Sequence, residues 1–317
     1  MLHSAHTSPT LLITGSTGQV GSELTRSLAP LGKVYALDRI GCDFSQPAQI
    51  REAVESIRPD IIANAAAYTA VDQAETDVDA AYAINARAPQ ALAEAAAKSG
   101  ALLIHYSTDY VFDGQKREPY VEDDPTNPLS VYGKSKLAGE SAITKIHERH
   151  LILRASWIFS VWGNNFFTTM LKLAGERARL RVVADQHGAP TSASLIADVT
   201  AHLVAQYLRA CGEVRFPYGV YHLAAAGVTT WHHYAQLIVE RALTIGLLHE
   251  GSAPNIEAIL SSEYPRAAPR PENSRLATDR LQTTFGLTLP RWEEGLEQSL
   301  RLLAVSQNLM MERSTSS

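Results

Sequence analysis

LLITGSTGQVG, residues 11–21, joins a short apolar run to a turn that carries three glycines. An amphipathic stretch with Val20, Leu24 and Leu28 on one face follows it. This order of strand, glycine turn and helix is typical of a dinucleotide site, because glycines let the backbone approach a pyrophosphate and the helix N-terminus presents N–H groups to it. The spacing is G-x-x-G-x-x-G rather than G-x-G-x-x-G. We expect the cofactor phosphates to lie against Gly15, Gly18 and Gly21.

Strand and helix patterns alternate from residue 11 to about residue 157. Such alternation predicts an α/β fold with a Rossmann-like, doubly wound parallel sheet. We place this NAD(P)-binding unit at residues 10–160. Residues 161–310 are expected to form mostly a smaller C-terminal substrate-binding cap, with some segments that return to the first unit. Residues 1–9 are expected to be a flexible extension.

The second expected strand, residues 34–38, ends in an acid. Asp38 stands about 20 residues past the glycine turn, where a carboxylate bonds the adenosine ribose hydroxyls. Arg39 follows at once, and a cation there can bind a 2′-phosphate instead, although it is also typical of a solvated strand end. The pair leaves the choice between NADPH and NADH open.

Two later segments are further candidates for cofactor contacts. Asp43 can bond the adenine amino group while Phe44 flanks the ring, but an acid directly before a helix is often only a cap. The strand expected at residues 60–67 ends in small side chains, which let a flat cofactor lie against the backbone. Tyr68 and Thr69 would then line the middle of the cofactor.

Tyr132 and Lys136 are the candidates for the chemical step. They are four residues apart, so on a helix they share one face. A nearby ammonium lowers the pKa of a tyrosine from its usual value near ~10, which suits the phenol to general acid–base work. Ser107 or Thr108 ends another expected strand at the carboxyl edge of the sheet, where a hydroxyl can donate to a carbonyl oxygen. The Y-x-x-x-K pattern is short, and it also occurs on ordinary exposed helices.

The composition excludes several classes of partner. The 317 residues carry a formal net charge of −5, which argues against nonspecific binding to nucleic acid or to an anionic membrane surface. No apolar run is long enough to span a bilayer. Cys42 and Cys211 lie far apart without a CxxC partner, so a reducing cytoplasm is expected. The histidines show no zinc-type spacing, and we expect no catalytic metal.

Several longer segments, in a fixed order, are more specific than any single motif. They are TGSTGQVGSEL, RPDIIANAAAYTAVDQAE, HYSTDYVFDG, NPLSVYGKSKLAGE, LRASWIF, DQHGAPTSA and RPENSRL. On these segments the chain resembles the extended short-chain dehydrogenase/reductase superfamily. Within it, the chain is most similar to the dTDP-4-dehydrorhamnose reductase family. The resemblance runs from about Leu11 to Trp292.

The resemblance implies a role for each candidate residue. Tyr132 would be the general acid, Lys136 would lower its pKa and hold the nicotinamide ribose, and Thr108 would orient the ketone. Asp109 and Trp157 would contact the sugar nucleotide. The residues that would contact the cofactor are Gly18, Gln19, Val20, Asp38, Asp43, Phe44, Ala67, Tyr68 and Thr69.

The implied reaction is the NADPH-dependent reduction of the C4 ketone of dTDP-4-dehydro-6-deoxy-L-mannose, which gives dTDP-L-rhamnose for cell-surface polysaccharide. Arg270 can pair with the substrate diphosphate or serve a structural purpose. A reductase that delivers hydride to the other face would form dTDP-6-deoxy-L-talose. An epimerase of the same superfamily would show no net cofactor turnover. A dehydratase is disfavoured, because the strand end reads Thr108-Asp109-Tyr110 without the glutamate of family dehydratases.

A non-catalytic role is the remaining alternative, because the beta subunit of methionine adenosyltransferase has this fold and binds a nicotinamide cofactor. Quaternary structure is also open between monomer and homodimer. Some family members dimerise around a divalent ion held by glutamates. Glu23 matches one of those positions, but a second is Ser194 here. Loss of a carboxylate weakens an oxygen site for Mg²⁺, so we expect no structural metal.

Overall fold

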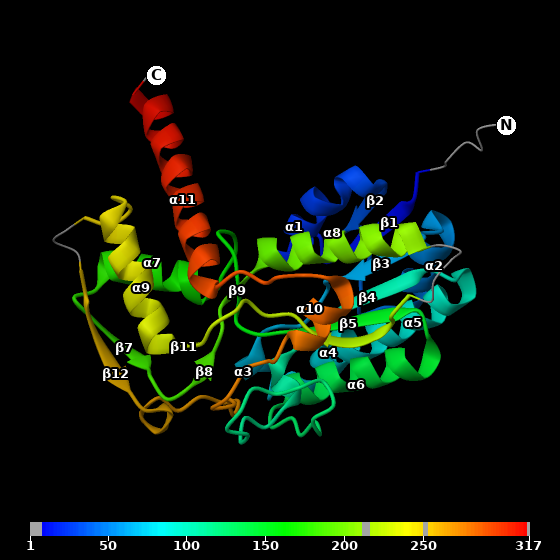
Figure 1. Ribbon diagram of the computed structural model, residues 1–317, viewed down its shortest axis with the longest axis horizontal. Coiled ribbons are helices and arrows are strands. Elements are labelled where there is room, and N and C mark those ends of the chain that lie inside the picture. Colours follow the sequence, from blue (N-terminus) through cyan, green and yellow to red (C-terminus); the bar gives the residue numbers. More distant parts are fainter. Residues whose placement is uncertain (1–7, 211–215, 250–252, 316–317) are drawn as a thin grey trace.

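In the computed structural model, a six-stranded parallel sheet forms the core of the larger part of the molecule, beside the smaller cap (Figure 1). The structure describes residues 8–210, 216–249 and 253–315, so most of the expected extension at residues 1–9 lies outside it, as does Cys211. The strand order is β10-β5-β4-β3-β1-β2, and every adjacent pair is parallel. The strands are β1 (Thr10–Thr14), β2 (Lys33–Leu37), β3 (Ile61–Asn64), β4 (Leu102–Thr108), β5 (His150–Ala155) and β10 (Gly219–His222).

The order of the strands fixes where a ligand can bind. The chain leaves β1 toward β2 on one side and continues from β3 on the other, so the topology reverses between β1 and β3. In open parallel sheets, ligands bind beyond the carboxyl ends of the strands at such a reversal. Thr14, Asn64 and Thr108 end β1, β3 and β4 at this edge. The expected α/β fold with a Rossmann-like, doubly wound sheet is therefore confirmed.

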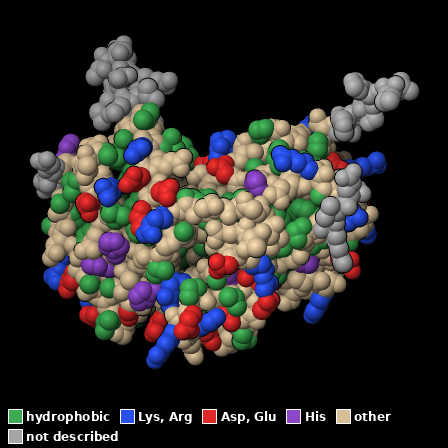
Figure 2. Space-filling model, viewed as in Figure 1, with side chains coloured by type: hydrophobic (Ala, Val, Ile, Leu, Met, Phe, Trp, Pro, Cys, Tyr) green, Lys and Arg blue, Asp and Glu red, His purple; other side chains and the backbone are tan. Residues whose placement is uncertain are grey.

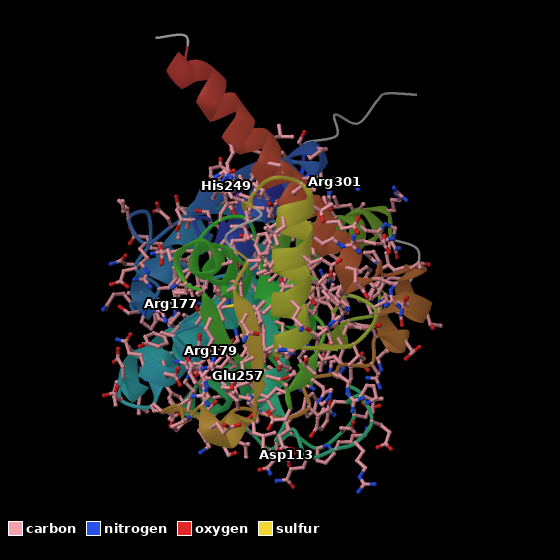
Figure 3. The ribbon with its side chains drawn as sticks, turned by 90° about the vertical axis from the view of Figure 1, so that its left-hand side faces the viewer. Asp113, Arg177, Arg179, His249, Glu257 and Arg301 are labelled. Carbon is pink, nitrogen blue, oxygen red and sulfur yellow. The ribbon has the colours of Figure 1, made fainter. Side chains whose placement is uncertain are left out.

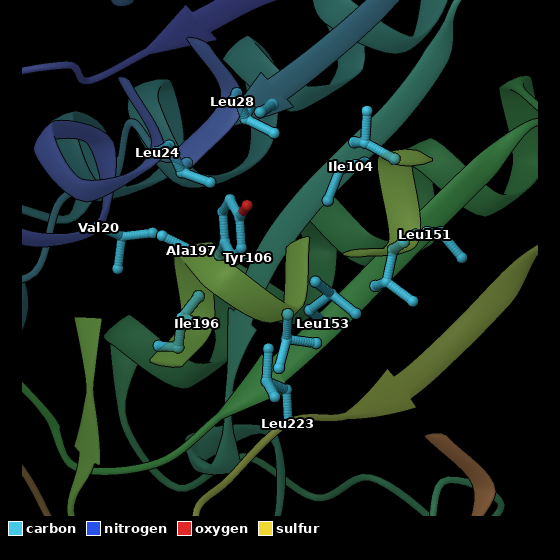
Figure 4. Close-up of a cluster of buried hydrophobic side chains, with 14 of the residues drawn as sticks. Val20, Leu24, Leu28, Ile104, Tyr106, Leu151, Leu153, Ile196, Ala197 and Leu223 are labelled. Atoms are coloured by element: carbon cyan, nitrogen blue, oxygen red, sulfur yellow. The ribbon is translucent and has the colours of Figure 1, made fainter. Parts of the chain in front are cut away.

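Helices cover both faces of the sheet because each buries one apolar stripe against it. On one face, α1 and α8 bury Val20, Leu24, Leu28 and Ile196 against strands that include β4 and β5 (Figure 4). On the other face, α2, α5 and α6 form a second apolar cluster with the sheet, which includes Cys42 and Phe44. These helices are α1 (Gln19–Leu28), α2 (Pro47–Ile57), α5 (Ala88–Ser99), α6 (Val131–Ile146) and α8 (Ala193–Ala210).

The smaller cap packs around its own core, in which Phe167, Tyr234 and Trp292 are buried. Its strands β7 (Arg179–Val183) and β12 (Asn255–Ile259) pair in parallel, and α9 (Trp231–Thr244) lies against both. Two further short pairs lie outside the central sheet, β6–β9 in parallel and β8–β11 antiparallel. The other elements are α3 (Val71–Ala74), α4 (Val78–Tyr82), β6 (Ile158–Phe159), α7 (Phe166–Glu176), β8 (His187–Gly188), β9 (Thr191–Ser192), β11 (Thr229–Thr230), α10 (Asp279–Phe285) and α11 (Trp292–Thr315).

The second half of the chain contributes to both parts of the molecule. Strand β10 completes the central sheet, and α8 and α10 bury side chains in the same core as α1. The long helix α11 starts in the cap and projects away from the body of the molecule (Figure 1). The proposed boundary between units 10–160 and 161–310 stays a prediction. Among the residues described, no helix is long and apolar enough to cross a bilayer.

Candidate active site

The glycine turn after β1 is shaped by two close backbone approaches. Gly15 has φ +66°, and a Cβ there would lie 2.7 Å from the Ala66 nitrogen. A Cβ on Gly21 would lie 2.1 Å from the Gly15 oxygen. Only glycine fits both positions. Gly18 is the N-cap of α1 and supplies no side-chain cap, so no capping side chain competes with a phosphate for the first N–H groups of the helix.

The end of β2 holds a carboxylate in a fixed position. Asp38 Oδ1 accepts from the backbone nitrogens of Ile40 and Gly41, both at 2.9 Å, while Arg39 is exposed. Asp43 accepts from the backbone and the hydroxyl of Ser45, so it stabilises the turn that leads into α2. The expected roles of these residues toward a ribose, a phosphate or an adenine remain predictions.

The segment after β3 is fixed to α6 by a buried amide that the sequence did not identify as part of the site. Asn85 Oδ1 accepts from the Tyr68 nitrogen at 2.9 Å, and Asn85 Nδ2 donates to the Tyr68 oxygen and to Ser135 Oγ, both at 3.0 Å. The segment 65–70 is coil rather than the end of a strand. Asn85 therefore holds Ala67, Tyr68 and Thr69 beside the helix that carries Tyr132. Its one sequence signal was a polar residue inside an alanine-rich stretch.

Tyr132 and Thr108 are brought together, as expected. Ser130 caps α6 by accepting from the Gly133 nitrogen at 3.1 Å, which places the partly buried Tyr132 in the first helical turn. Burial raises the pKa of Tyr132 to about 12, while a hydrogen bond with the Thr108 hydroxyl acts in the opposite direction. The phenol is thus held protonated at neutral pH beside a second hydroxyl.

The contacts of Lys136 are with β4, whereas the sequence predicted an ammonium that acts on Tyr132. Its Nζ donates to the Tyr106 oxygen at 2.6 Å and lies 3.2 Å from His105 Nε2, so it is directed at β4. Burial lowers the pKa of Lys136 to about 8, and the charge of Glu140 opposes this shift. Burial, the Thr108 hydroxyl and the charge of Asp109 set the pKa of Tyr132 in this structure, and the expected lowering of that pKa by Lys136 stays a prediction.

A buried ion pair joins α6, the helix that carries Tyr132 and Lys136, to strand β5. Arg154 on β5 bonds Glu140 on α6 through two nitrogens, Nε to Oε1 at 3.0 Å and Nη2 to Oε2 at 2.7 Å. Ser107 donates to the same carboxylate at 2.5 Å. Because Ser107 precedes Thr108 and Glu140 follows Lys136 by one helical turn, the pair fixes α6 against β4 at the level of the chemistry.

The residues expected to contact the sugar nucleotide lie at the same edge. Asp109 is 3% exposed, and burial raises the pKa of its carboxyl group to about 6. Trp157 adopts φ +48°, a left-handed conformation that is strained for a tryptophan. Its ring stacks on Trp231 of the cap with centroids 3.6 Å apart. A Cβ on Gly188 would meet the Trp157 ring at 2.5 Å, so glycine is needed there.

A cavity of about 1280 Å³ lies between this edge and the cap. Its wall includes Tyr110, whose ring packs edge-on against Tyr132 with centroids 5.5 Å apart, but not Tyr132 itself. Arg270 also lines it and forms a two-pronged ion pair with Asp72 of α3, at 2.9 and 2.8 Å. The structure therefore gives Arg270 a structural contact, while a role toward a diphosphate stays a prediction.

The positions linked with a divalent ion carry ordinary contacts. Glu23 pairs with Arg26 at 3.1 Å, and Ser194 Oγ lies 3.0 Å from Ser192 Oγ. Within residues 8–210, 216–249 and 253–315, no group of three or more His, Cys, Asp or Glu side chains is arranged to hold a metal.

Comparison with known proteins identifies the family. The model of the RmlD substrate binding domain family matches residues 9–305. The dTDP-4-dehydrorhamnose reductase of Salmonella typhimurium is 49% identical over 294 residues, which cover 92% of this chain and 96% of the relative. The chain belongs to the dTDP-4-dehydrorhamnose reductase family. The Burkholderia thailandensis member of the family is 47% identical, over 89% of this chain and 95% of that one.

Solved structures of the family have the same architecture. The Bacillus anthracis dTDP-4-dehydrorhamnose reductase, solved in complex with NADP, has a TM-score of 0.83 at 36% identity, over 92% of this chain and 98% of that one. The Clostridium acetobutylicum dTDP-4-dehydrorhamnose reductase has a TM-score of 0.84 at 34% identity, over 93% and 99%. Both the fold and the enzyme family expected from the sequence are confirmed.

Proposed function

We propose that this protein reduces the C4 ketone of dTDP-4-dehydro-6-deoxy-L-mannose to dTDP-L-rhamnose with NADPH. The observation that carries the proposal is the pair of hydroxyls on Tyr132 and Thr108, which lie at the same carboxyl edge of the sheet as the glycine turn. Its reductase relatives and the NADP complex of the Bacillus anthracis enzyme support the same activity.

The residues around the turn fit a dinucleotide. Gly15 and Gly21 leave no room for side chains, and the start of α1 offers backbone N–H groups to a pyrophosphate. Asp38 would bond the adenosine ribose hydroxyls or Arg39 would bind the 2′-phosphate, and Tyr68 would lie along the middle of the cofactor. Bound NADPH supplies the hydride that reduces C4.

The side chains at the edge supply the proton and orient the ketone. The phenol of Tyr132 is protonated at neutral pH, so it can donate to the oxygen that gains charge at C4. Thr108 donates to the same oxygen and fixes its direction. Lys136, as an ammonium, stabilises the phenolate that remains. Asp109 and Trp157 would contact the sugar nucleotide.

The proposed reaction is tested by product analysis. Incubation with dTDP-4-dehydrorhamnose and NADPH should form one NADP⁺ per sugar, with the L-rhamno configuration at C4 in the NMR spectrum. A 6-deoxy-L-talo product would mean that hydride arrives on the other face. Absence of NADP⁺ formation would favour an epimerase or a regulatory subunit.

Arg39→Ala tests the choice of cofactor. Loss of an arginine–phosphate hydrogen bond should raise KM for NADPH about tenfold and leave KM for NADH unchanged. Steady-state kinetics with both cofactors measures the ratio, and Arg58→Ala, at the far end of α2, is the control. An equal rise in KM for NADPH and for NADH would show that Arg39 does not bind the 2′-phosphate.

A chelator tests for a metal-dependent dimer. Because Ser194 stands where a carboxylate would be needed, we expect the elution volume in gel filtration to be the same with EDTA and with Mg²⁺. A change of elution volume on chelation would contradict this expectation. Whether the protein is a monomer or a homodimer follows from light scattering on the same column.

The cytoplasm is the compartment we propose, since a sugar nucleotide and NADPH meet there and Cys42 is buried as a thiol. Figure 2 shows basic and acidic side chains interspersed over the visible face, which fits a protein that recognises a small molecule rather than a nucleic acid.

A further inference from the structure

Three buried side chains form a hydrogen-bonded chain across the sheet and end at Lys136. Thr14, Asn64 and His105 are register partners on the adjacent strands β1, β3 and β4. Thr14 Oγ1 donates to Asn64 Oδ1 at 2.6 Å, and Asn64 Nδ2 lies 2.9 Å from His105 Nδ1. His105 Nε2 lies 3.2 Å from Lys136 Nζ. The proposed reaction assigns no role to Asn64 or to His105.

His105 is confined to its neutral form. It has no exposed surface, and burial together with the charge of Lys136 holds its pKa well below the usual range. A neutral imidazole has one proton, on Nδ1 or on Nε2, and the other nitrogen accepts. The partner at Nδ1 decides which of the two tautomers is present.

Each tautomer favours a different form of Lys136. With the carboxamide nitrogen of Asn64 toward Nδ1, as in this structure, the ring proton lies on Nε2. Lys136 Nζ can then accept it only as an uncharged amine, while its own N–H donates to the Tyr106 oxygen. With the carboxamide oxygen toward Nδ1, the proton moves there and Nε2 accepts from an ammonium. The Thr14 hydroxyl can donate or accept, so it satisfies both orientations of the amide.

We propose that His105 is a positioning residue that sets the charge of Lys136, and that Asn64 acts through it by selecting which ring nitrogen carries the proton. The proposal rests on the proposed function, in which a charged Lys136 stabilises the phenolate. It links the end of β1, where the phosphate turn begins, to the catalytic lysine. In this proposal, a 180° rotation of the Asn64 carboxamide is enough to convert Lys136 from the uncharged amine into the ammonium.

Other charged or titratable groups near Lys136 are accounted for. Glu140 follows it on α6 and favours the ammonium, but that carboxylate is shared with Arg154 of β5. Tyr132 precedes it on α6 and is held protonated by burial. Asp109 lies beyond the end of β4 and acts on Tyr132. None of these groups is in the path from Asn64 through the imidazole.

The test is the pKa of Lys136, read from the NMR titration of ¹³Cε-labelled lysine. Asn64→Asp presents only acceptor oxygens to Nδ1, so it should raise this pKa by about one unit, the size of one hydrogen bond to a charged group. In the His105→Phe background the same substitution should have less than half of that effect, because the ring can no longer transmit it. His105→Gln, whose carboxamide oxygen can accept from the ammonium, should raise the pKa as well.

His147→Phe is the matched control, because it removes another buried imidazole, bonded to the Ala101 oxygen at the opposite end of α6. It should leave the pKa of Lys136 unchanged. An equal shift from Asn64→Asp with and without His105 would show a through-space charge effect and overturn the proposal. An unchanged pKa of Lys136 in Asn64→Asp would also overturn the proposal. If that variant fails to fold, an unchanged pKa of Lys136 in His105→Gln would overturn it.

The titration needs no turnover, so it separates this proposal from the proposed function. If the protein is the reductase, the alkaline limb of the kcat profile should move in Asn64→Asp by the same amount as the lysine pKa. If the pKa moves and the protein reduces no sugar nucleotide, the proposed function fails while the control of Lys136 by His105 stands.

Discussion

Tyr132→Phe should lower kcat by about a thousandfold while the Kd for NADPH changes less than twofold. General acid catalysis contributes roughly 10²–10⁴-fold, and the variant removes the phenol hydroxyl that is hydrogen-bonded with Thr108. Phenylalanine fills the same volume, so the packing against Tyr110 is retained. Single-turnover kinetics measures the chemical step, and fluorescence titration measures NADPH binding.

Tyr106→Phe is the control for the loss of a buried phenol near this edge. The Tyr106 hydroxyl bonds Thr200 of α8 at 2.9 Å, on the face of the sheet opposite to α6. Its loss should cost about 1 kcal/mol of stability and leave kcat within a factor of two. If Tyr132→Phe kept the full kcat, Tyr132 could not be the general acid, whatever kcat the Tyr106→Phe variant shows.

The features that were predictable from sequence depend on contacts close in the chain. The glycine turn follows from the pattern of residues 11–21, because strand, turn and helix must follow each other there. Asp38 falls at the end of β2 because strand length and helix length fix the distance from the turn. The helix that carries the chemical step was expected from the spacing of Tyr132 and Lys136, which are four residues apart.

The features that were missed depend on which strands become neighbours. His105 meets Lys136, and Asn64 meets His105, only because β3 and β4 pair in one particular register. No local pattern encodes that register. The direction of the Lys136 side chain follows from acceptors on β4 and not from its spacing to Tyr132. The cap is built from strands far apart in sequence, such as β7 and β12, so its shape could not be derived from periodicity.

Arg154→Met should destabilise the protein by about 3–5 kcal/mol. The variant leaves the Glu140 carboxylate, 4% exposed, without its charged partner, and an uncompensated buried charge is costly. Ser107 alone would remain as a donor to that carboxylate. Urea denaturation, followed by circular dichroism, gives the free energy of unfolding, with an unchanged m-value as the check on two-state behaviour.

The double variant Glu140→Leu/Arg154→Met separates the cost of an orphaned charge from the value of the pair. It replaces both ions with apolar side chains, so it should recover most of the lost stability, except for the bond that Ser107 loses. Arg179→Ala is the surface control. Arg179 pairs with Glu257 between β7 and β12, but its side chain is 65% exposed, and the change should cost less than about 1 kcal/mol (Figure 3). If the double variant were as unstable as Arg154→Met, the pair itself, and not the avoidance of an unpaired charge, would hold α6 against β5.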